Sequence, residues 1–224
     1  MSVLYLVSTP IGNLKDISLR ALEILKQVDI VLAEDTRKTG LLLKHFSIPK
    51  KTLISFFEAN ENKRIPEVLK LMQEKNSIAL VTNAGTPLIS DPGYKLVRTC
   101  IEKGIKVESI PGASAVLTAL TSSGLAPDKF LFLGFLPKKQ GKKEKLLENI
   151  KKLHSLIPAT IVCYLSPYRV VKDLKIINKV LGDINIVLAR ELTKIHEEIR
   201  REKVSESIIH FEKVKPKGEF VLLF

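Results

Sequence analysis

The sequence predicts an α/β fold of two domains, each a mainly parallel or mixed sheet flanked by helices. Short β-rich runs alternate with segments of helical periodicity, and signals for tight hairpins are few. A length of 224 residues suits two domains of about 100 residues each. With 45% hydrophobic residues, the chain can fill a substantial core and does not have the composition of a disordered segment.

Eight short apolar runs are predicted as strands. They are Val3–Val7, Ile30–Ala33, Ile78–Val81, Val107–Ile110, Phe130–Leu133, Thr160–Tyr164, Ile184–Ala189 and Phe220–Phe224. Between them, apolar residues recur near the 3.6-residue period of a helix. Three such faces are Ile65, Val68, Leu69 and Met72; Leu146, Ile150, Leu153 and Ile157; and Val170, Leu174, Ile177 and Leu181.

A domain boundary is predicted near Ser122–Lys129, where Gly124 and Pro127 interrupt the pattern. We therefore expect an N-terminal domain of residues 1–121 and a C-terminal domain of residues 122–224. Ligands of open parallel sheets bind at the carboxyl ends of the strands, and two such domains would form a cleft.

Composition narrows the classes of protein. No apolar run approaches the roughly 20 residues that cross a bilayer, and the N-terminal MSVLYLV has neither the basic region nor the cleavage site of a signal peptide. Cys100 and Cys163 have no His at metal-ligand spacing, so we expect no metal. Two cysteines in apolar or helical patterns suit a reducing compartment, and we expect a soluble cytoplasmic protein.

The net charge of +12 favours a polyanionic partner. Residues 1–113 carry 16 basic and 12 acidic side chains, and residues 114–224 carry 20 and 12. Each phosphate neutralised by Lys or Arg releases counterions, which favours nucleic acid. A Lys-rich composition with merely solvated lysines is the alternative. The same choice applies to Lys138–Lys152, where seven lysines stand against two glutamates: phosphate contacts, or a solvated helix face.

Gly, Pro and small polar residues gather directly after the predicted strands. STPIGNL, TNAGTPLISDPG and PGASA follow strands of the first half, and GFLPKK, SPYR and RELTK follow strands of the second. Backbone N–H groups at the helix that PGASA opens can bind an anion, and the Asn and Thr of NAGTP offer hydrogen bonds. Each motif alone could be a helix cap or a tight turn. Together they predict a small polar ligand.

Other nucleotide and hydrolytic sites are excluded by pattern. The chain has no G-x-x-x-x-G-K-[ST] and no G-x-G-x-x-G after a strand, so the P-loop and ordinary Rossmann fingerprints are missing. None of the four histidines lies in H-E-x-x-H or beside a Ser or Cys elbow, which argues against metalloprotease and triad chemistry.

Eight motifs in this order resemble those of the bacterial small-subunit ribosomal RNA 2′-O-ribose cytidine methyltransferases, which share their fold with the tetrapyrrole methylases. The resemblance covers nearly the whole chain. The motifs are STPIGNLKDIS (8–18), AEDTRKTGLLLKHF (33–46), NAGTPLISDPG (83–93), PGASA (111–115), GFLP (134–137), SPYR (166–169), RELTKIHEE (190–198) and KGEF (217–220).

This resemblance implies the tetrapyrrole-methylase (class III) fold, a homodimer, and S-adenosylmethionine bound in the cleft between the domains. It also implies 16S ribosomal RNA, within the small ribosomal subunit, as partner, and the decoding-centre cytidine as the modified nucleotide. By motif matching, the cofactor contacts are Pro10, Ile11, Asn83, Ala84, Gly85, Thr86, Ser114, Ala115, Ser166, Ala189 and Gly218.

Three departures from the family pattern bear on the site. The family usually has Asp where this chain has Asn83, which removes an ionic contact to the cofactor's amino group. Where relatives read close to YHEHNE, this chain reads FFEANE (56–61), so no catalytic His is assigned there. Many relatives continue into a small C-terminal domain, and we expect its contribution to RNA binding to be missing here.

A sulfonium methyl is already electrophilic, so the protein's main tasks are positioning and exclusion of water. A ribose hydroxyl is a weak acid, so a base or nearby cations would assist its attack. The candidates for these roles are Asp35, Arg37, Glu58, Glu191 and Lys194. The alternative for them is a buried ion-pair network between the domains.

Two other functions remain open at this point. A tetrapyrrole C-methyltransferase would share the fold, although EDTR, RELTK and the positive charge suit RNA better. A non-catalytic RNA-binding or ribosome-assembly protein that has lost its cofactor is the second, and the replacement at Asn83 favours it.

Overall fold

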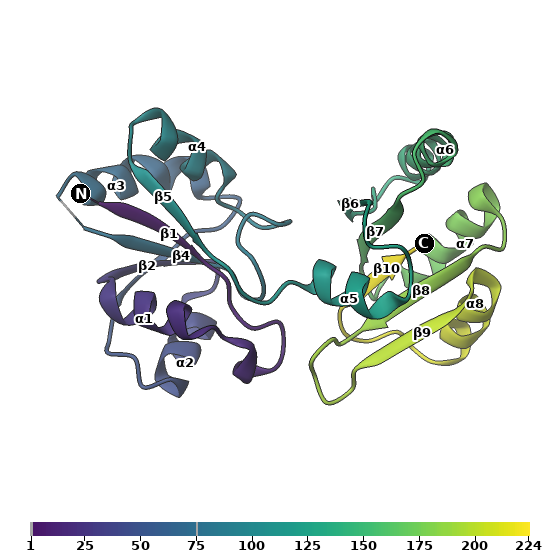
Figure 1. The fold of residues 1–224 in the computed structure, drawn as a ribbon, viewed down its shortest axis with the longest axis horizontal. Helices are drawn as coiled ribbons and strands as arrows, with labels where there is room; N and C mark the ends of the chain where they lie inside the picture. Colours follow the sequence, from purple (N-terminus) through teal and green to yellow (C-terminus); the bar gives the residue numbers. More distant parts are fainter. Residues whose placement is uncertain (1, 75) are drawn as a thin grey trace. The chain divides into compact units, whose positions relative to one another are not determined.

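A computed structural model describes residues 2–74 and 76–224 (Figure 1). The chain divides into two compact units, Met1–Ser114 (unit 1) and Ala115–Phe224 (unit 2), each built around its own five-stranded sheet. Among the described residues, no helix is long and apolar enough to cross a membrane.

Unit 1 is a doubly wound α/β unit with a wholly parallel sheet. Its strands lie in the order β3-β2-β4-β1-β5, so β1 sits between β4 and β5. The elements are β1 (Val3–Val7), a 3-10 turn (Leu14–Asp16), α1 (Leu19–Gln27), β2 (Ile30–Ala33), α2 (Thr36–His45), β3 (Thr52–Ser55), α3 (Glu61–Gln73), β4 (Ile78–Val81), α4 (Tyr94–Glu102) and β5 (Lys106–Ile110).

Unit 2 has a mixed sheet in the order β6-β7-β10-β8-β9, in which β6 pairs in parallel with β7 and the other neighbouring pairs are antiparallel. Antiparallel pairing allows β8 and β9 to be joined directly by the RELTK loop, without a crossover helix. The elements are α5 (Ala115–Ser123), β6 (Phe130–Phe135), α6 (Gln140–Leu156), β7 (Thr160–Leu165), α7 (Val170–Leu181), β8 (Asn185–Arg190), β9 (Glu198–Lys203), α8 (Val204–Lys213) and β10 (Phe220–Leu223).

The boundary between the units differs from the expected one. A division between residues 121 and 122 falls inside α5, whereas the chain divides between Ser114 and Ala115. Helix α5 packs against β7, β8 and β10, and the Arg201 side chain donates hydrogen bonds to the carbonyls of Ser122 and Ser123 at its carboxyl end. The whole helix therefore belongs to unit 2, and the Gly- and Pro-containing stretch lies beyond it.

All eight predicted strands are confirmed, with ends that shift by no more than two residues. The sequence-based expectation missed β3 and β9. Strand β3 has only four residues, and β9 reads EIRREK, whose charges conceal a strand that lies at the sheet edge. Charged side chains on an edge strand discourage pairing with other chains.

Unit 1 buries both faces of its sheet, as a parallel sheet with crossover helices requires. Figure 1 shows α1 and α2 on one face and α3 and α4 on the other. Alternate residues of β1 divide between the two layers: Val7 packs with Leu25 of α1, and Leu4 packs in the cluster of Met72 and Cys100 from α3 and α4. This explains why the strands read as continuous apolar runs.

In unit 2, α6, α7 and α8 supply one core layer against the sheet. The predicted apolar face of α7 is confirmed, because Val170, Leu174 and Ile177 are fully buried. The predicted face of α6 is wrong in part. Leu153 is 37% exposed, and Ile157 lies beyond the helix end and is 53% exposed.

The residues that α6 does bury include a charged one, Lys143, beside Leu147 and Ile150. The Lys143 ammonium pairs with the carboxylate of Asp173 on α7, and both side chains are almost wholly inaccessible to water. Lys143 is therefore neither a phosphate-binding nor a solvated lysine, which corrects both interpretations of the basic segment for this residue. The second carboxylate oxygen of Asp173 has no hydrogen-bond partner among the described residues.

Removing one partner of this buried pair should strongly destabilise unit 2. Because the remaining charge would be left unpaired in the core, Lys143→Ala and Asp173→Ala should each lower the free energy of unfolding by about 3–5 kcal/mol. Urea titration followed by circular dichroism measures this. The double variant Lys143→Met, Asp173→Leu should recover most of the loss; a double variant as unstable as either single variant would contradict the interpretation.

Candidate functional site

The loops that follow β1, β4 and β5 are joined at the carboxyl edge of the unit 1 sheet. Thr9 and Gly85 exchange two backbone hydrogen bonds, of 2.9 and 3.0 Å between nitrogen and oxygen. The Ser8 N–H donates to the Ile110 carbonyl at 3.3 Å. The three loops lie at one edge of the unit 1 sheet because β1 lies between β4 and β5 and runs parallel to both.

Hydroxyl groups extend this connection. Ser8 Oγ donates to Thr86 Oγ1 at 3.3 Å, and Thr86 Oγ1 donates to the Ala113 carbonyl of the PGASA loop at 3.2 Å. Gly112 lies so close to Ser8 that it leaves no room for a side chain: an added Cβ would lie 2.9 Å from the Cβ of Ser8. Gly85 has a φ of +85°, which a residue with a side chain rarely adopts.

Asn83 presents an acceptor with no partner at this edge. Its Oδ1 is buried and has no hydrogen bond within the described residues, while its backbone N–H donates to Glu34 Oε2 at 3.4 Å. Buried polar atoms are nearly always satisfied, so an orphaned oxygen indicates a donor that the chain itself does not supply. An N–H or O–H group of a small polar ligand could donate a hydrogen bond to this oxygen. The side chain of Asn83 is a neutral amide, so the contact would not be an ion pair.

Two carboxylates that sequence reasoning passed over lie beside Asn83. Glu34, after β2, accepts from Thr82 Oγ1 at 3.4 Å, and Asp91 lies in the same loop as Thr82. Burial raises the pKa of Asp91 to about 6; a hydrogen bond from Thr82 lowers it in part, and the charge of Glu34 raises it further. Both residues lie inside quoted motifs, but their proximity depends on β2 pairing with β4.

Asp91 should make the stability of unit 1 fall as pH rises through about pH 4–6. In the unfolded chain its carboxyl has the ordinary aspartate pKa of 3.8, so in this interval the folded protein binds more protons than the unfolded chain. The loss should be on the order of 1 kcal/mol, because the group is partly open to solvent screening. Asp91→Asn should flatten the profile in urea unfolding at pH 4, 5, 6 and 7. Identical profiles for both proteins would contradict this assignment.

Asp35 and Arg37 form a local pair at the start of α2. Asp35 caps the helix by accepting from the Arg37 N–H at 2.9 Å, and its two oxygens also accept from the Arg37 guanidinium at 3.2 and 3.0 Å. The Arg37 side chain is 88% exposed, so these two do not form the buried ion pair that was the alternative interpretation. The Arg37 hydrogen bond lowers the pKa of Asp35 to about 2, which makes it a weak base.

Glu58 is exposed in the turn between β3 and α3. Its neighbours in FFEANE have structural roles: Phe56 is fully buried in the core, and Glu61 caps another helix. Glu61 Oε1 accepts from the N–H groups of Gly93 and Lys95, both at 3.2 Å, at the start of α4. This carboxylate ties the loop after β3 to the loop after β4.

In unit 2, the RELTK loop is fixed by the KGEF segment. Glu191 Oε1 accepts from Lys194 Nζ and from the Glu219 N–H, both at 2.9 Å, and Lys194 Nζ also reaches Glu219 Oε2 at 2.8 Å. Burial raises the pKa of Glu191, but the hydrogen bonds from Lys194 and Glu219 lower it below its ordinary value overall. Burial lowers the pKa of Lys194, and its two carboxylate partners raise it overall. The site therefore holds a fixed ammonium.

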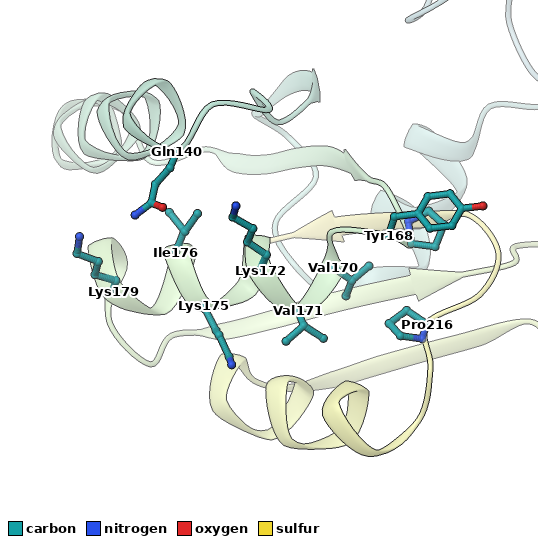
Figure 2. Close-up of a pocket in the computed structure, with 10 residues that line it drawn as sticks. Gln140, Tyr168, Val170, Val171, Lys172, Lys175, Ile176, Lys179 and Pro216 are labelled. Carbon is teal, nitrogen blue, oxygen red and sulfur yellow. The ribbon is translucent and has the colours of Figure 1, made fainter.

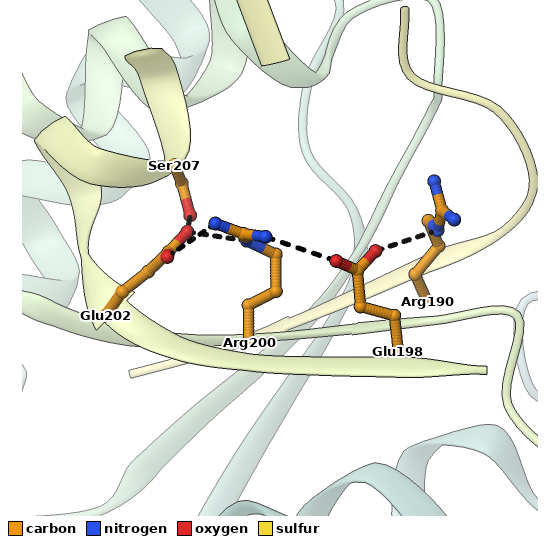
Figure 3. A network of polar contacts seen from close by, with 5 residues as sticks. All are labelled: Arg190, Glu198, Arg200, Glu202 and Ser207. Carbon is orange, nitrogen blue, oxygen red and sulfur yellow. Dashed lines mark hydrogen bonds and ion pairs between the residues drawn. The ribbon is translucent and has the colours of Figure 1, made fainter. Parts of the chain in front are cut away.

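Next to this loop, alternating basic and acidic side chains of β8 and β9 form a row of ion pairs (Figure 3). Glu198 pairs with Arg190 and with Arg200, each at 3.2 Å, and Arg200 pairs with Glu202 at 2.7 Å. Glu202 also accepts from the Ser207 hydroxyl of α8. Of these contacts, the Arg190–Glu198 pair joins β8 to β9, the two Arg200 pairs run along β9, and the Ser207 hydrogen bond joins β9 to α8.

Of the remaining expected contacts, Pro10 and Ile11 lie buried in the loop after β1. Ala84 is half-buried beside Gly85. Ser114 ends unit 1 and Ala115 begins α5.

Ser166 follows β7, where its carbonyl accepts from the Arg169 N–H at 2.8 Å. Ala189 lies in β8 and is fully buried, one residue before the end of the strand. The residues described contain no group of three or more His, Cys, Asp or Glu side chains that could hold a metal ion.

Gly218 should be essential for the Glu191–Lys194–Glu219 cluster. A Cβ there would lie 2.5 Å from Glu191 Cδ at a φ of +88°. Gly182 has a similar φ of +85° but nothing within 4 Å, so Gly182→Ala isolates the backbone strain.

Gly218→Ala should lower the free energy of unfolding by about 1–3 kcal/mol more than Gly182→Ala, since overpacking adds to strain. It should also speed amide hydrogen exchange at Glu219, whose N–H donates to Glu191. Equal losses in the two variants would show that the close approach to Glu191 is unimportant.

Comparison with known proteins gives a consistent family. The model of the family described as Tetrapyrrole (Corrin/Porphyrin) Methylases matches residues 3–207. Ribosomal RNA small subunit methyltransferase I of Thermotoga maritima is 48% identical over 223 residues, covering 100% of this chain and 98% of the relative. The protein of the same name from Synechocystis sp. is 46% identical over 224 residues, covering 100% and 78%.

Solved structures agree on the fold. Diphthine synthase superposes with a TM-score of 0.75 at 17% identity, covering 99% of this chain and 89% of that one. The cobalamin biosynthetic enzyme cobalt precorrin-4 methyltransferase gives a TM-score of 0.70 at 21% identity, covering 99% and 94%. At sequence identities this low, a superposition is evidence for the fold alone. The two superpositions confirm the α/β fold that the motifs imply.

Proposed function

Since this chain belongs to the family of tetrapyrrole (corrin/porphyrin) methylases, we propose that it transfers a methyl group from S-adenosylmethionine to a ribose 2′-hydroxyl of 16S ribosomal RNA. The proposed target is the decoding-centre cytidine within the small ribosomal subunit. Relatives at 42–48% identity that carry the name ribosomal RNA small subunit methyltransferase I support the substrate, as does the net charge of +12. The proposal includes a homodimer and a cytoplasmic location.

One observation carries the cofactor assignment: three loops are joined at one sheet edge around the unsatisfied Oδ1 of Asn83. The absence of a side chain at Gly112 lets its loop approach Ser8 closely, which leaves backbone N–H and C=O groups near any ligand at this edge. The residues proposed to hold S-adenosylmethionine are Pro10, Ile11, Asn83, Ala84, Gly85, Thr86, Ser114, Ala115, Ser166, Ala189 and Gly218.

When bound, the cofactor supplies an electrophilic methyl group. The chain's own residues would then orient the ribose and stabilise charge on its oxygen. Lys194, held as an ammonium by two carboxylates, and Arg37, held by Asp35, are the proposed cations for the developing alkoxide. Asp35 and Glu191 have lowered pKa values, so we propose that they position these cations and do not accept the proton. Glu58 remains the proposed base.

Arg37→Ala and Lys194→Ala should each reduce methyl transfer by about 100-fold, because removal of one preorganised cation or donor weakens transition-state stabilisation by several kcal/mol. Binding of S-adenosylmethionine, measured by calorimetry, should change little. Transfer is measured with radiolabelled cofactor on small ribosomal subunits isolated from cells that lack this protein, followed by mass-spectrometric mapping of the modified ribose.

Lys151→Ala on an exposed turn of α6 serves as the matched control and should keep full activity. Unchanged turnover in both site variants would remove Arg37 and Lys194 from the mechanism. Label transferred to a porphyrinogen precursor in place of RNA would identify a tetrapyrrole C-methyltransferase. Failure to bind the cofactor at millimolar concentration would favour a non-catalytic RNA-binding protein.

A further inference from the structure

Unit 2 has a groove of about 580 Å³ along the exposed side of α7. Its rim carries Lys172, Lys175 and Lys179 on α7, with Gln140 of α6 at one end and Tyr168 and Pro216 at the other (Figure 2). The lysines are separated by three and four residues, so they follow one helix face at steps of about 5 Å. We refer to this surface as the α7 groove.

The charges of the α7 groove are available to a partner. Lys172 is exposed and forms no ion pair with any described residue. Lys175 pairs with Glu212 at 2.6 Å and Lys179 with Glu144 at 2.8 Å, but these lysine side chains are 57% and 67% exposed. Such exposed pairs contribute little and exchange readily, so a phosphate could replace either carboxylate. Buried lysines such as Lys143 cannot do this.

An aromatic ring stands beside this row of charges. Tyr168 is 93% exposed and lies in the turn just before α7, at the same end of the groove as Pro216 (Figure 2). An exposed ring with lysines alongside is the combination that binds single-stranded or looped RNA, in which bases stack and phosphates pair with cations. An acidic protein segment would use the lysines but would gain nothing particular from the ring.

We propose that the α7 groove binds the sugar–phosphate backbone of the RNA substrate, with Lys172, Lys175 and Lys179 on successive phosphates and Tyr168 against an unstacked base. This rests on the proposed function and adds a second contact surface to it, outside the residues assigned to the cofactor and to methyl transfer. Phosphate contacts fix position without reading sequence, so the groove sets affinity and orientation.

A charge-matched pair of variants tests this. The groove variant combines Lys172→Gln, Lys175→Gln and Lys179→Gln. The control combines Lys142→Gln, Lys145→Gln and Lys152→Gln, which removes three exposed charges from α6 of the same unit. At about 100° per residue, these lysines lie about 120–200° around the helix from Gln140, which lines the groove, so the control charges point away from it.

Binding of both variants to small ribosomal subunits from cells that lack this protein is measured at several salt concentrations. The groove variant should bind at least about tenfold more weakly. The negative slope of log affinity against log salt should become shallower by about 2–3, because fewer counterions are released. The control should lose much less. Tyr168→Ala should weaken binding without changing the salt slope, since stacking releases no counterions. Affinity for S-adenosylmethionine should stay the same in all three.

Equal losses in the groove variant and the control would overturn the proposal, because only overall charge would then matter. Full RNA affinity in the groove variant would also overturn it and would leave the groove to another partner, such as an acidic protein. Both results differ from failure of the proposed function, in which the wild-type protein itself neither binds the subunits nor methylates their RNA.

Discussion

Strand β1 lies between β4 and β5, and this position constrains the whole edge of unit 1. The chain that leaves β1 must satisfy its backbone groups from both neighbours, and it does so through Gly85 on one side and Ile110 on the other. The close approach of Ser8 leaves no room for a side chain at Gly112, and the φ of +85° favours glycine at position 85. At the same edge, the Oδ1 of Asn83 is buried and has no hydrogen-bond partner among the described residues, so it can accept a hydrogen bond from a ligand.

In unit 2, ion pairs and a carboxylate–backbone hydrogen bond hold the corresponding loop in place. Its RELTK loop contains two residues with positive φ, Glu191 and Thr193, a conformation that costs energy unless the surroundings hold it. Glu191 is held because its carboxylate accepts from Lys194 and from the Glu219 backbone, over a glycine that leaves it room. A loop fixed in this way keeps an ammonium in one place, which is what stabilisation of a developing negative charge requires.

The net charge alone does not show which cations of this protein can bind a partner. Some cations serve the fold: Lys143 neutralises a buried carboxylate, and Arg200 lies between two glutamates of the β8–β9 hairpin. Others, such as Lys172, are exposed and uncommitted within the described chain. The net charge of +12 indicated a polyanionic partner, but only the positions of the individual side chains separate structural cations from those that can meet a phosphate.

The sequence by itself determined the α/β class, the eight apolar strands and the loops that follow them, because apolar periodicity and the steric freedom of glycine act locally. It also identified Asn83 and the RELTK loop through their motifs. Tertiary structure alone decided the strand order, and with it the meeting of Glu34 with Thr82 and Asp91, which lie far from it in sequence. It likewise decided that Lys143 is buried and that the charged EIRREK segment is an edge strand. These features depend on which surfaces of different helices and strands pack together. Local sequence does not indicate which distant segment a residue will contact.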